Sequence, residues 1–298
     1  MLRKIVLSLW ITLLSIPSYA YIPPSNFIVK SWVKTRKGLK PIRIRNLVTA
    51  YSNNKPETTS FKEVLYFNPT AMTLVSSALS SASSPSSPNY PNYKDETGNR
   101  LYSVSKSISS AALASVLMLS PDEQAVVSSL LERGIPIRKE FIPVLPTGSS
   151  PEAMPAAENE VEALTRIDRQ VNKVAWIIGT TDPKDEVRPQ IWFEKDTFYP
   201  LKLKLLGFAE TSQDSSKVYD VTFENYQSIH RLPIPRLIKV LDKNGSVLLT
   251  SELIDMTSTF KPEAHLSQGI EKGHFTPMGE SASSSMKDLI QIYYDAIR

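Results

Sequence analysis

The sequence predicts an α+β fold in which helices cover the concave side of a strongly curved antiparallel sheet. Strand-like segments follow one another closely between residues 172 and 253, and one pair is joined by an Asn-Gly turn. Two mid-chain segments and the last segment carry apolar residues at helical spacing. Hydrophobic residues make up 41% of the 298 residues, so the chain is able to bury a large core.

The first twenty residues have the pattern of a cleavable export signal. Arg3 and Lys4 precede a short apolar stretch, and a helix breaker with small residues ends at Ala20. The apolar stretch is shorter than the roughly 20 residues that a membrane span needs. We therefore predict a signal peptide at 1–20, cleavage after Ala20, and a single mature domain at 21–298.

Composition excludes several classes of protein. Without cysteine the chain has no disulfide, no thiolate metal site and no lipid-bearing cysteine. The net charge is +4, and it falls to +2 once Arg3 and Lys4 leave with the signal peptide, which is too small for a typical nucleic-acid binder. Basic clusters at 34–40, 43–45 and 201–205 alternate with apolar residues. They fit outward faces of strands, and the alternative is attraction to anionic lipid headgroups.

The first third of the chain reads as strands. Period-two alternation is clear in "IRIRNLVTAY", and β-branched or aromatic residues dominate the others. A Ser/Pro-rich tract at 80–93 interrupts them and predicts a loop. The strands are expected at 26–35, 42–51, 61–67, 72–79 and 99–108.

A pair of helices is predicted at 109–134. The first, up to residue 119, is apolar and rich in alanine. The second is expected to begin with Ser120 as N-cap, to form a capping box with Glu123, and to end at Gly134. A Pro/Ala/Glu-rich stretch at 141–162 follows, and we interpret it as a linker-like loop within the domain.

The second half predicts a β-meander followed by one helix. The strands are expected at 172–179, 189–194, 198–207, 217–226 and in a hairpin over 235–253. The final helix, 283–298, carries an apolar stripe, which should pack on the sheet. This stripe consists of Met286, Leu289, Ile290, Tyr293 and Ile297.

The meander offers more apolar surface than two or three helices need to cover, which suggests a hydrophobic cavity. An acyl chain buried there would gain about 0.8 kcal/mol per methylene without any catalytic residue. The alternative is an ordinary core between sheet and helices. The candidate cavity residues are Trp176, Ile178, Ile191, Phe193, Leu201, Leu203, Leu205, Tyr219, Val221, Phe223, Ile238, Val240, Val247 and Leu249.

Signatures of catalysis are missing from the sequence. It contains no HExxH, GxSxG, P-loop or GxGxxG pattern. Two histidines and two glutamates between residues 263 and 274 would suffice for a zinc site, but no rigid element is predicted to hold them. We therefore predict no catalytic residue, no metal and no cofactor, and we expect a protein that is not an enzyme.

Three motifs in the second half carry a resemblance to a known family. "QIWFEKDTFYP" (190–200) leads into an alternating strand, "VTFENY" (221–226) follows, and "PIPRLIKV" (233–240) precedes a tight turn. Over about residues 174–253 this order resembles the outer-membrane lipoprotein-sorting superfamily, the Lol-type periplasmic lipoprotein carriers. The resemblance implies an unclosed half-barrel with helices over its mouth. The chain is longer than the small carriers, and we expect no helix directly after the signal peptide, where they have one.

The function that the resemblance implies is a periplasmic, non-catalytic carrier. Its ligand would be a lipid or the acyl chains of a lipoprotein, and a membrane-bound protein would release or accept the cargo. The sequence leaves two alternatives open. One is a structural or interaction protein of the cell envelope without a lipid ligand, and the other is a secreted hydrolase that uses the histidines and glutamates at 263–274.

Overall fold

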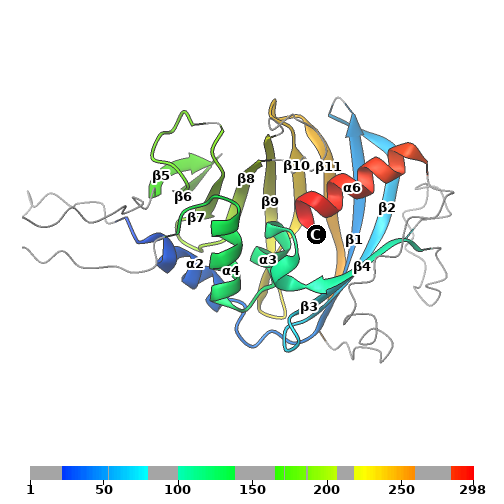
Figure 1. Ribbon diagram of the computed structural model, residues 1–298, viewed down its shortest axis with the longest axis horizontal. Coiled ribbons are helices and arrows are strands. Elements are labelled where there is room, and N and C mark those ends of the chain that lie inside the picture. Colours follow the sequence, from blue (N-terminus) through cyan, green and yellow to red (C-terminus); the bar gives the residue numbers. More distant parts are fainter. Residues whose placement is uncertain are drawn as a thin grey trace, which may run out of the picture.

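The computed structural model describes residues 22–52, 54–79, 100–137, 165–170, 172–185, 187–206, 218–258 and 283–298. Within these ranges one 11-stranded antiparallel sheet has the order β4-β3-β2-β1-β11-β10-β9-β8-β7-β6-β5. The sheet curves without closing, and the helices lie on its concave side (Figure 1). The predicted α+β fold with an unclosed, strongly curved sheet is confirmed.

Two meanders meet in the middle of the sheet. β1 to β4 run from the centre to one edge, and β5 to β11 return from the other edge until β11 pairs with β1. The strands are β1 Ile42–Ser52, β2 Lys55–Asn68, β3 Thr73–Leu79, β4 Arg100–Ser107, β5 Thr165–Gln170, β6 Lys173–Ile178, β7 Gln190–Glu194, β8 Pro200–Leu206, β9 Val218–Ile229, β10 Leu232–Leu241 and β11 Val247–Thr257. β5 is the one strand among these that the sequence did not predict.

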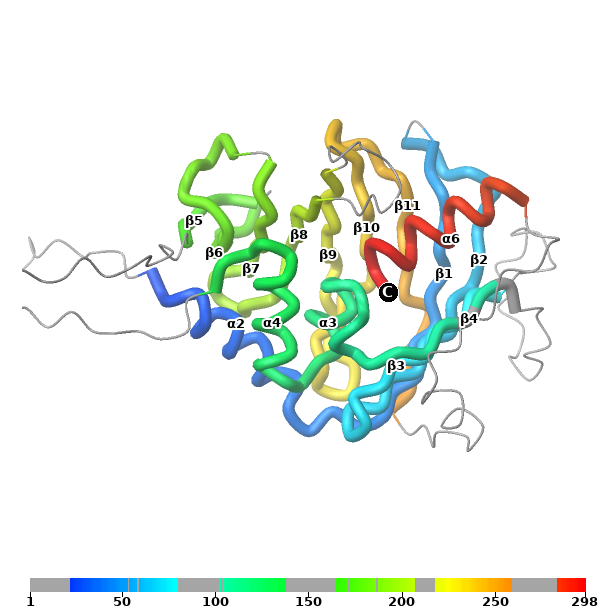
Figure 2. The backbone as a smooth tube through the Cα atoms, in the orientation of Figure 1, coloured from blue at the N-terminus to red at the C-terminus, as the bar shows by residue number. Residues whose placement is uncertain are grey.

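The helices are α2 Ser25–Lys34, the short 3₁₀ turn η1 Ile108–Ser110, α3 Leu113–Leu119, α4 Glu123–Glu132 and α6 Ser284–Ile297. The predicted C-terminal helix is confirmed as α6, whose apolar stripe is turned inward, with Leu289, Ile290, Tyr293 and Ile297 buried. α6 lies against β2, so segments from opposite ends of the sequence pack together (Figure 2).

The prediction of a strand at 26–35 was wrong, and so was the expectation that no helix follows the predicted signal peptide. Residues 25–34 form α2, and its buried side chains are Ser25, Ile28, Val29, Trp32 and Val33. Their spacing of three and four residues is helical. The β-branched residues Ile28, Val29 and Val33 favour strands in isolation, but burial of this stripe on the sheet decides the local structure.

The mid-chain helices differ from the prediction in their starts. Residues 108–110 form the 3₁₀ turn, and α3 begins only at Leu113, because Ala112 is extended and donates its backbone N–H to the Arg298 carbonyl at 3.0 Å. α4 is capped by Asp122, whose carboxylate accepts from the Gln124 N–H at 2.9 Å, rather than by Ser120. The loops predicted at 80–93 and 141–162 lie outside the described residues.

The core lies between the inner face of the sheet and the helices. Both meanders contribute fully buried side chains, such as Phe61 and Leu74 from one and Phe193 and Leu203 from the other. A second, small apolar cluster lies apart from this core, on the outer face of β6, β7 and β8. It consists of Ala175, Ile177, Trp192 and Leu201.

Candidate functional site

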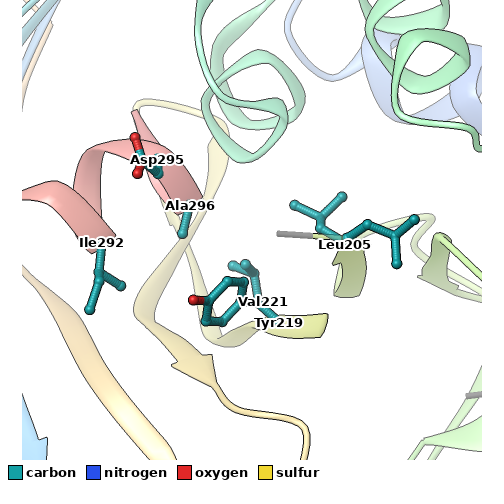
Figure 3. Close-up of a pocket in the computed structure, with 7 residues that line it drawn as sticks. Leu205, Tyr219, Val221, Ile292, Asp295 and Ala296 are labelled. Atoms are coloured by element: carbon teal, nitrogen blue, oxygen red, sulfur yellow. The ribbon is translucent and has the colours of Figure 1, made fainter. Parts of the chain in front are cut away.

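An apolar pocket opens between α6 and the ends of β8 and β9. Figure 3 shows side chains from the helix and the two strands facing each other across it. Its volume is about 60 Å³, well below the roughly 300–1,000 Å³ of sites that enclose a whole small molecule. The lining residues are Leu205 and Leu206 on β8, Tyr219 and Val221 on β9, and Ile292, Asp295 and Ala296 on α6.

Three of the predicted cavity residues, Leu205, Tyr219 and Val221, line this pocket. Most others face the same interior but are packed by the protein's own side chains and the covering helices. The part of the interior that these residues line is therefore filled in the described structure, whereas the seam beside α6 holds an open pocket. The packed residues are Trp176, Ile178, Ile191, Phe193, Leu203, Phe223, Ile238, Val240 and Leu249. Val247 is partly buried and belongs to neither apolar cluster.

Leu201 faces the other way, contrary to the predicted alternation. The register between β7 and β8 shifts between Trp192 and Phe193, so that Trp192 pairs with Lys202 while Phe193 pairs with Pro200. Leu201 is thus the extra residue of a β-bulge, and a bulge breaks the strict alternation of side chains between the two faces of a sheet. Leu201 therefore joins Trp192 in the outer cluster, while Leu203 stays in the interior.

The α6 wall of the pocket was not predicted from the sequence. Ile292 and Ala296 are one helical turn apart and lie beside the apolar stripe of α6. The sequence predicted sheet contacts for that stripe and for no other residue of the helix. A helix whose apolar residues extend past a single stripe covers more than one surface. The wide apolar face of this helix therefore could have indicated a second contact surface in the sequence.

A buried carboxylate holds the end of α6 in place. Glu63 on β2 is 0% exposed and receives hydrogen bonds from Asn46 Nδ2 at 2.7 Å, Ser76 Oγ at 2.7 Å and Tyr293 Oη at 2.5 Å. Arg298 adds two more, from Nε at 2.6 Å and Nη2 at 2.9 Å. Both carboxylate oxygens are thus fully used, as a buried charge requires.

Arg298 extends this cluster to α3. Its Nη1 donates to Ser115 Oγ at 3.1 Å, and Ser115 Oγ donates to the Ile297 carbonyl at 2.5 Å. Because Ser76 donates to Glu63, the contact of 2.7 Å between Ser76 Oγ and Tyr294 Oη has the tyrosine as donor. The cluster therefore joins the first meander, α3 and the last turn of α6, next to the pocket wall.

The pKa of Glu63 reflects two opposing effects. Burial raises it, but the charge of Arg298 and the hydrogen bonds from Arg298, Tyr293 and Ser76 outweigh burial, so the pKa lies below the ordinary value for glutamate. Burial also raises the pKa of Tyr293 and Tyr294, so both stay protonated donors at neutral pH.

We expect the Glu63 contribution to stability to depend on pH. A carboxyl group with a lowered pKa in the folded state contributes fully above its unfolded pKa of about 4.3, and the contribution disappears as the pH falls through the folded value. The difference in urea midpoint between the natural protein and Glu63→Gln should therefore shrink when the pH is lowered from about 6 to about 3. A difference that stays constant over this range would contradict the assignment of a charged Glu63.

A second buried charge fastens α2. Arg36 is 0% exposed and donates to the carbonyls of Met118 at 3.1 Å and Pro233 at 2.9 Å, while its guanidinium lies 3.6 Å from the Trp32 ring centroid. Burial lowers the pKa of Arg36 to about 9, so it remains a cation at neutral pH. The backbone carbonyls and the ring face stabilise this cation and tie α2 to α3 and β10.

The described residues contain no group of three or more His, Asp or Glu side chains that would hold a metal ion. The histidines and glutamates at 263–274, like the predicted signal peptide at 1–20, lie outside the described ranges. None of the helices within those ranges is long and apolar enough to cross a membrane.

No protein-family model and no curated protein matches the chain. Solved structures match it loosely. The chain is similar to LolA-superfamily proteins. One from Nitrosomonas europaea has a TM-score of 0.42 and 11% identity, covering 81% of this chain and 96% of its own. An outer membrane lipoprotein-sorting protein domain from Vibrio parahaemolyticus has a TM-score of 0.40 and 11% identity, covering 83% and 97%.

Proposed function

We propose that the protein is a periplasmic, non-catalytic carrier that binds an acyl chain of a lipid or lipoprotein between α6 and the β8–β9 wall. The observation that carries the proposal is the pocket lining, in which Asp295 is the only charged side chain. Leu206 at this site is 43% exposed, which places apolar surface where a chain would enter. The export signal predicted at 1–20 and the motifs at 190–240 agree with this function.

The size of the pocket sets how the ligand enters. About 60 Å³ accepts only the end of a chain, so a longer chain requires the two walls to separate. The last turn of α6 is held by Arg298 and Tyr293 on the buried Glu63 carboxylate. We therefore propose that the β8–β9 wall moves while α6 stays in place.

Ala296→Leu should abolish binding of a fluorescent fatty-acid probe, because three added carbons fill the pocket from the α6 side. Ala and Leu both favour helices, so α6 should persist. The measurement is a probe titration on protein purified from the expressing cells, with its N-terminus determined by mass spectrometry and expected at Tyr21. Leu203→Glu is a weaker test, since Leu203 is 0% exposed in the core and the change would report on folding.

Ser284→Leu is the matched control, since it introduces the same side chain at an exposed position of α6 that is about three turns away from the pocket. This variant should bind the probe like the natural protein. Equal probe affinity for Ala296→Leu and the natural protein would refute the pocket as the acyl site.

The filled interior supports a second proposal, a structural or interaction protein of the cell envelope. Phe193, Leu203 and Val240 are each 0% exposed, which leaves little room for cargo in the closed state. Protein that carries no lipid by mass spectrometry, ignores the probe and retains a protein partner through purification would favour this function over the carrier.

A further inference from the structure

The outer face of α2 has a composition that the core does not explain. Phe27, Lys30 and Lys34 lie at spacings of three and four residues, opposite the buried stripe around Trp32, and Lys37 follows in the turn after the helix. All four are exposed, and the exposed fraction of Phe27 is 49%. This face therefore combines an exposed aromatic ring with a row of three positive charges.

Positive charge collects on this face. The sequence from residue 22 to residue 56 contains lysines and arginines but no Asp or Glu. In the part of the chain that the structure describes, Lys30, Lys34 and Lys37 form no ion pair. The neighbouring α4 has Asp122 as its N-cap and carries Glu123 and Glu132, so the acidic residues of this region belong to α4 and not to α2.

The apolar part extends beyond Phe27. The Phe27 ring packs edge-on against Phe198 in the turn between β7 and β8, with centroids 5.9 Å apart. Ile22, just before the helix, is 44% exposed. Exposed apolar groups at the start of a helix, with lysines along the same face, form the arrangement that lies flat on a lipid–water interface.

We propose that the outer face of α2 docks the protein on an anionic lipid surface. Phe27 enters the boundary between headgroups and acyl chains, and Lys30, Lys34 and Lys37 contact lipid phosphates. An anionic membrane matches this face in two ways: its phosphates carry the negative charge that the lysines attract, and its apolar layer covers the Phe27 ring. This docking site is separate from the α6 pocket and does not depend on it.

Co-sedimentation with vesicles tests the proposal. The full chain as purified from the expressing cells should bind vesicles of phosphatidylcholine mixed with phosphatidylglycerol and should not bind phosphatidylcholine alone. Each lysine near such a surface changes binding by about fivefold, so replacing all three with glutamine should weaken binding on the order of a hundredfold. Phe27→Ala should weaken it further, and added salt should weaken binding of the natural protein.

The matched control replaces three exposed lysines outside α2, Lys55, Lys184 and Lys243, with glutamine. This variant changes the net charge by the same amount, and its vesicle affinity should stay within a few-fold of that of the natural protein. No binding to anionic vesicles, or equal losses in both triple variants, would overturn the proposal. Ala296→Leu should sediment like the natural protein, so failure of the acyl pocket and failure of this surface are told apart.

Discussion

Glu63→Gln is expected to lower the free energy of unfolding by about 3–5 kcal/mol at neutral pH. The substitution keeps the shape of the side chain but removes the negative charge. Arg298 is only 4% exposed, and its Nε and Nη2 both donate to the Glu63 carboxylate. The substitution therefore leaves Arg298 as a buried cation without its partner charge. Urea unfolding followed by circular dichroism measures the loss.

Glu57→Gln is the control for this prediction, because Glu57 lies on the same strand, β2, and is exposed. It should change stability by no more than about 0.5 kcal/mol. Combining Glu63→Gln with Arg298→Met should recover part of the loss, because the unpaired cation is removed. A Glu63→Gln protein with the natural urea midpoint would show that the cluster does not hold α6.

Trp32→Ala should also cost about 3–5 kcal/mol, because a large aromatic side chain is deleted from a closed core. Trp32 is 0% exposed and donates from Nε1 to the Leu117 carbonyl at 2.8 Å. It meets the rings of Tyr199 and Tyr226 edge-on at 5.8 and 6.3 Å between centroids. The substitution removes these contacts and the ring beneath the Arg36 guanidinium.

Phe27→Ala in the same helix is the matched comparison. Phe27 faces outward and contacts Phe198, so its loss should cost about 1 kcal/mol or less. The two variants together test which face of α2 is buried. Similar losses in both would contradict the orientation of α2 and, with it, the lipid-docking face.

The strands of the second half could be predicted because their local pattern agrees with their burial. In β9 the buried Val221 and Phe223 alternate with partly buried polar residues, and this period of two is visible in the sequence. α2 was missed because its β-branched residues favour a strand, while the stripe that decides the structure is defined only by what it packs against.

Parts of the site were visible in the sequence and went unused. Glu63 shares the alternation of Phe61, Leu65 and Phe67, so a charge on the buried face of β2 was predictable. Its partner was not, because Arg298 lies 235 residues away and no local pattern connects them. The direction of Leu201 was hidden for a similar reason, since a β-bulge depends on pairing with β7.

By itself, the sequence determined the antiparallel strands of the second half, the amphipathic C-terminal helix and an interior face rich in apolar side chains. These follow from periodicity, which is a property of neighbouring residues. Only the tertiary structure decided that most of the predicted cavity residues are packed, that a pocket lies beside Ala296, and that a buried ion pair holds α6 against β2. The physical reason is that packing, register and charge pairing join residues far apart in the chain.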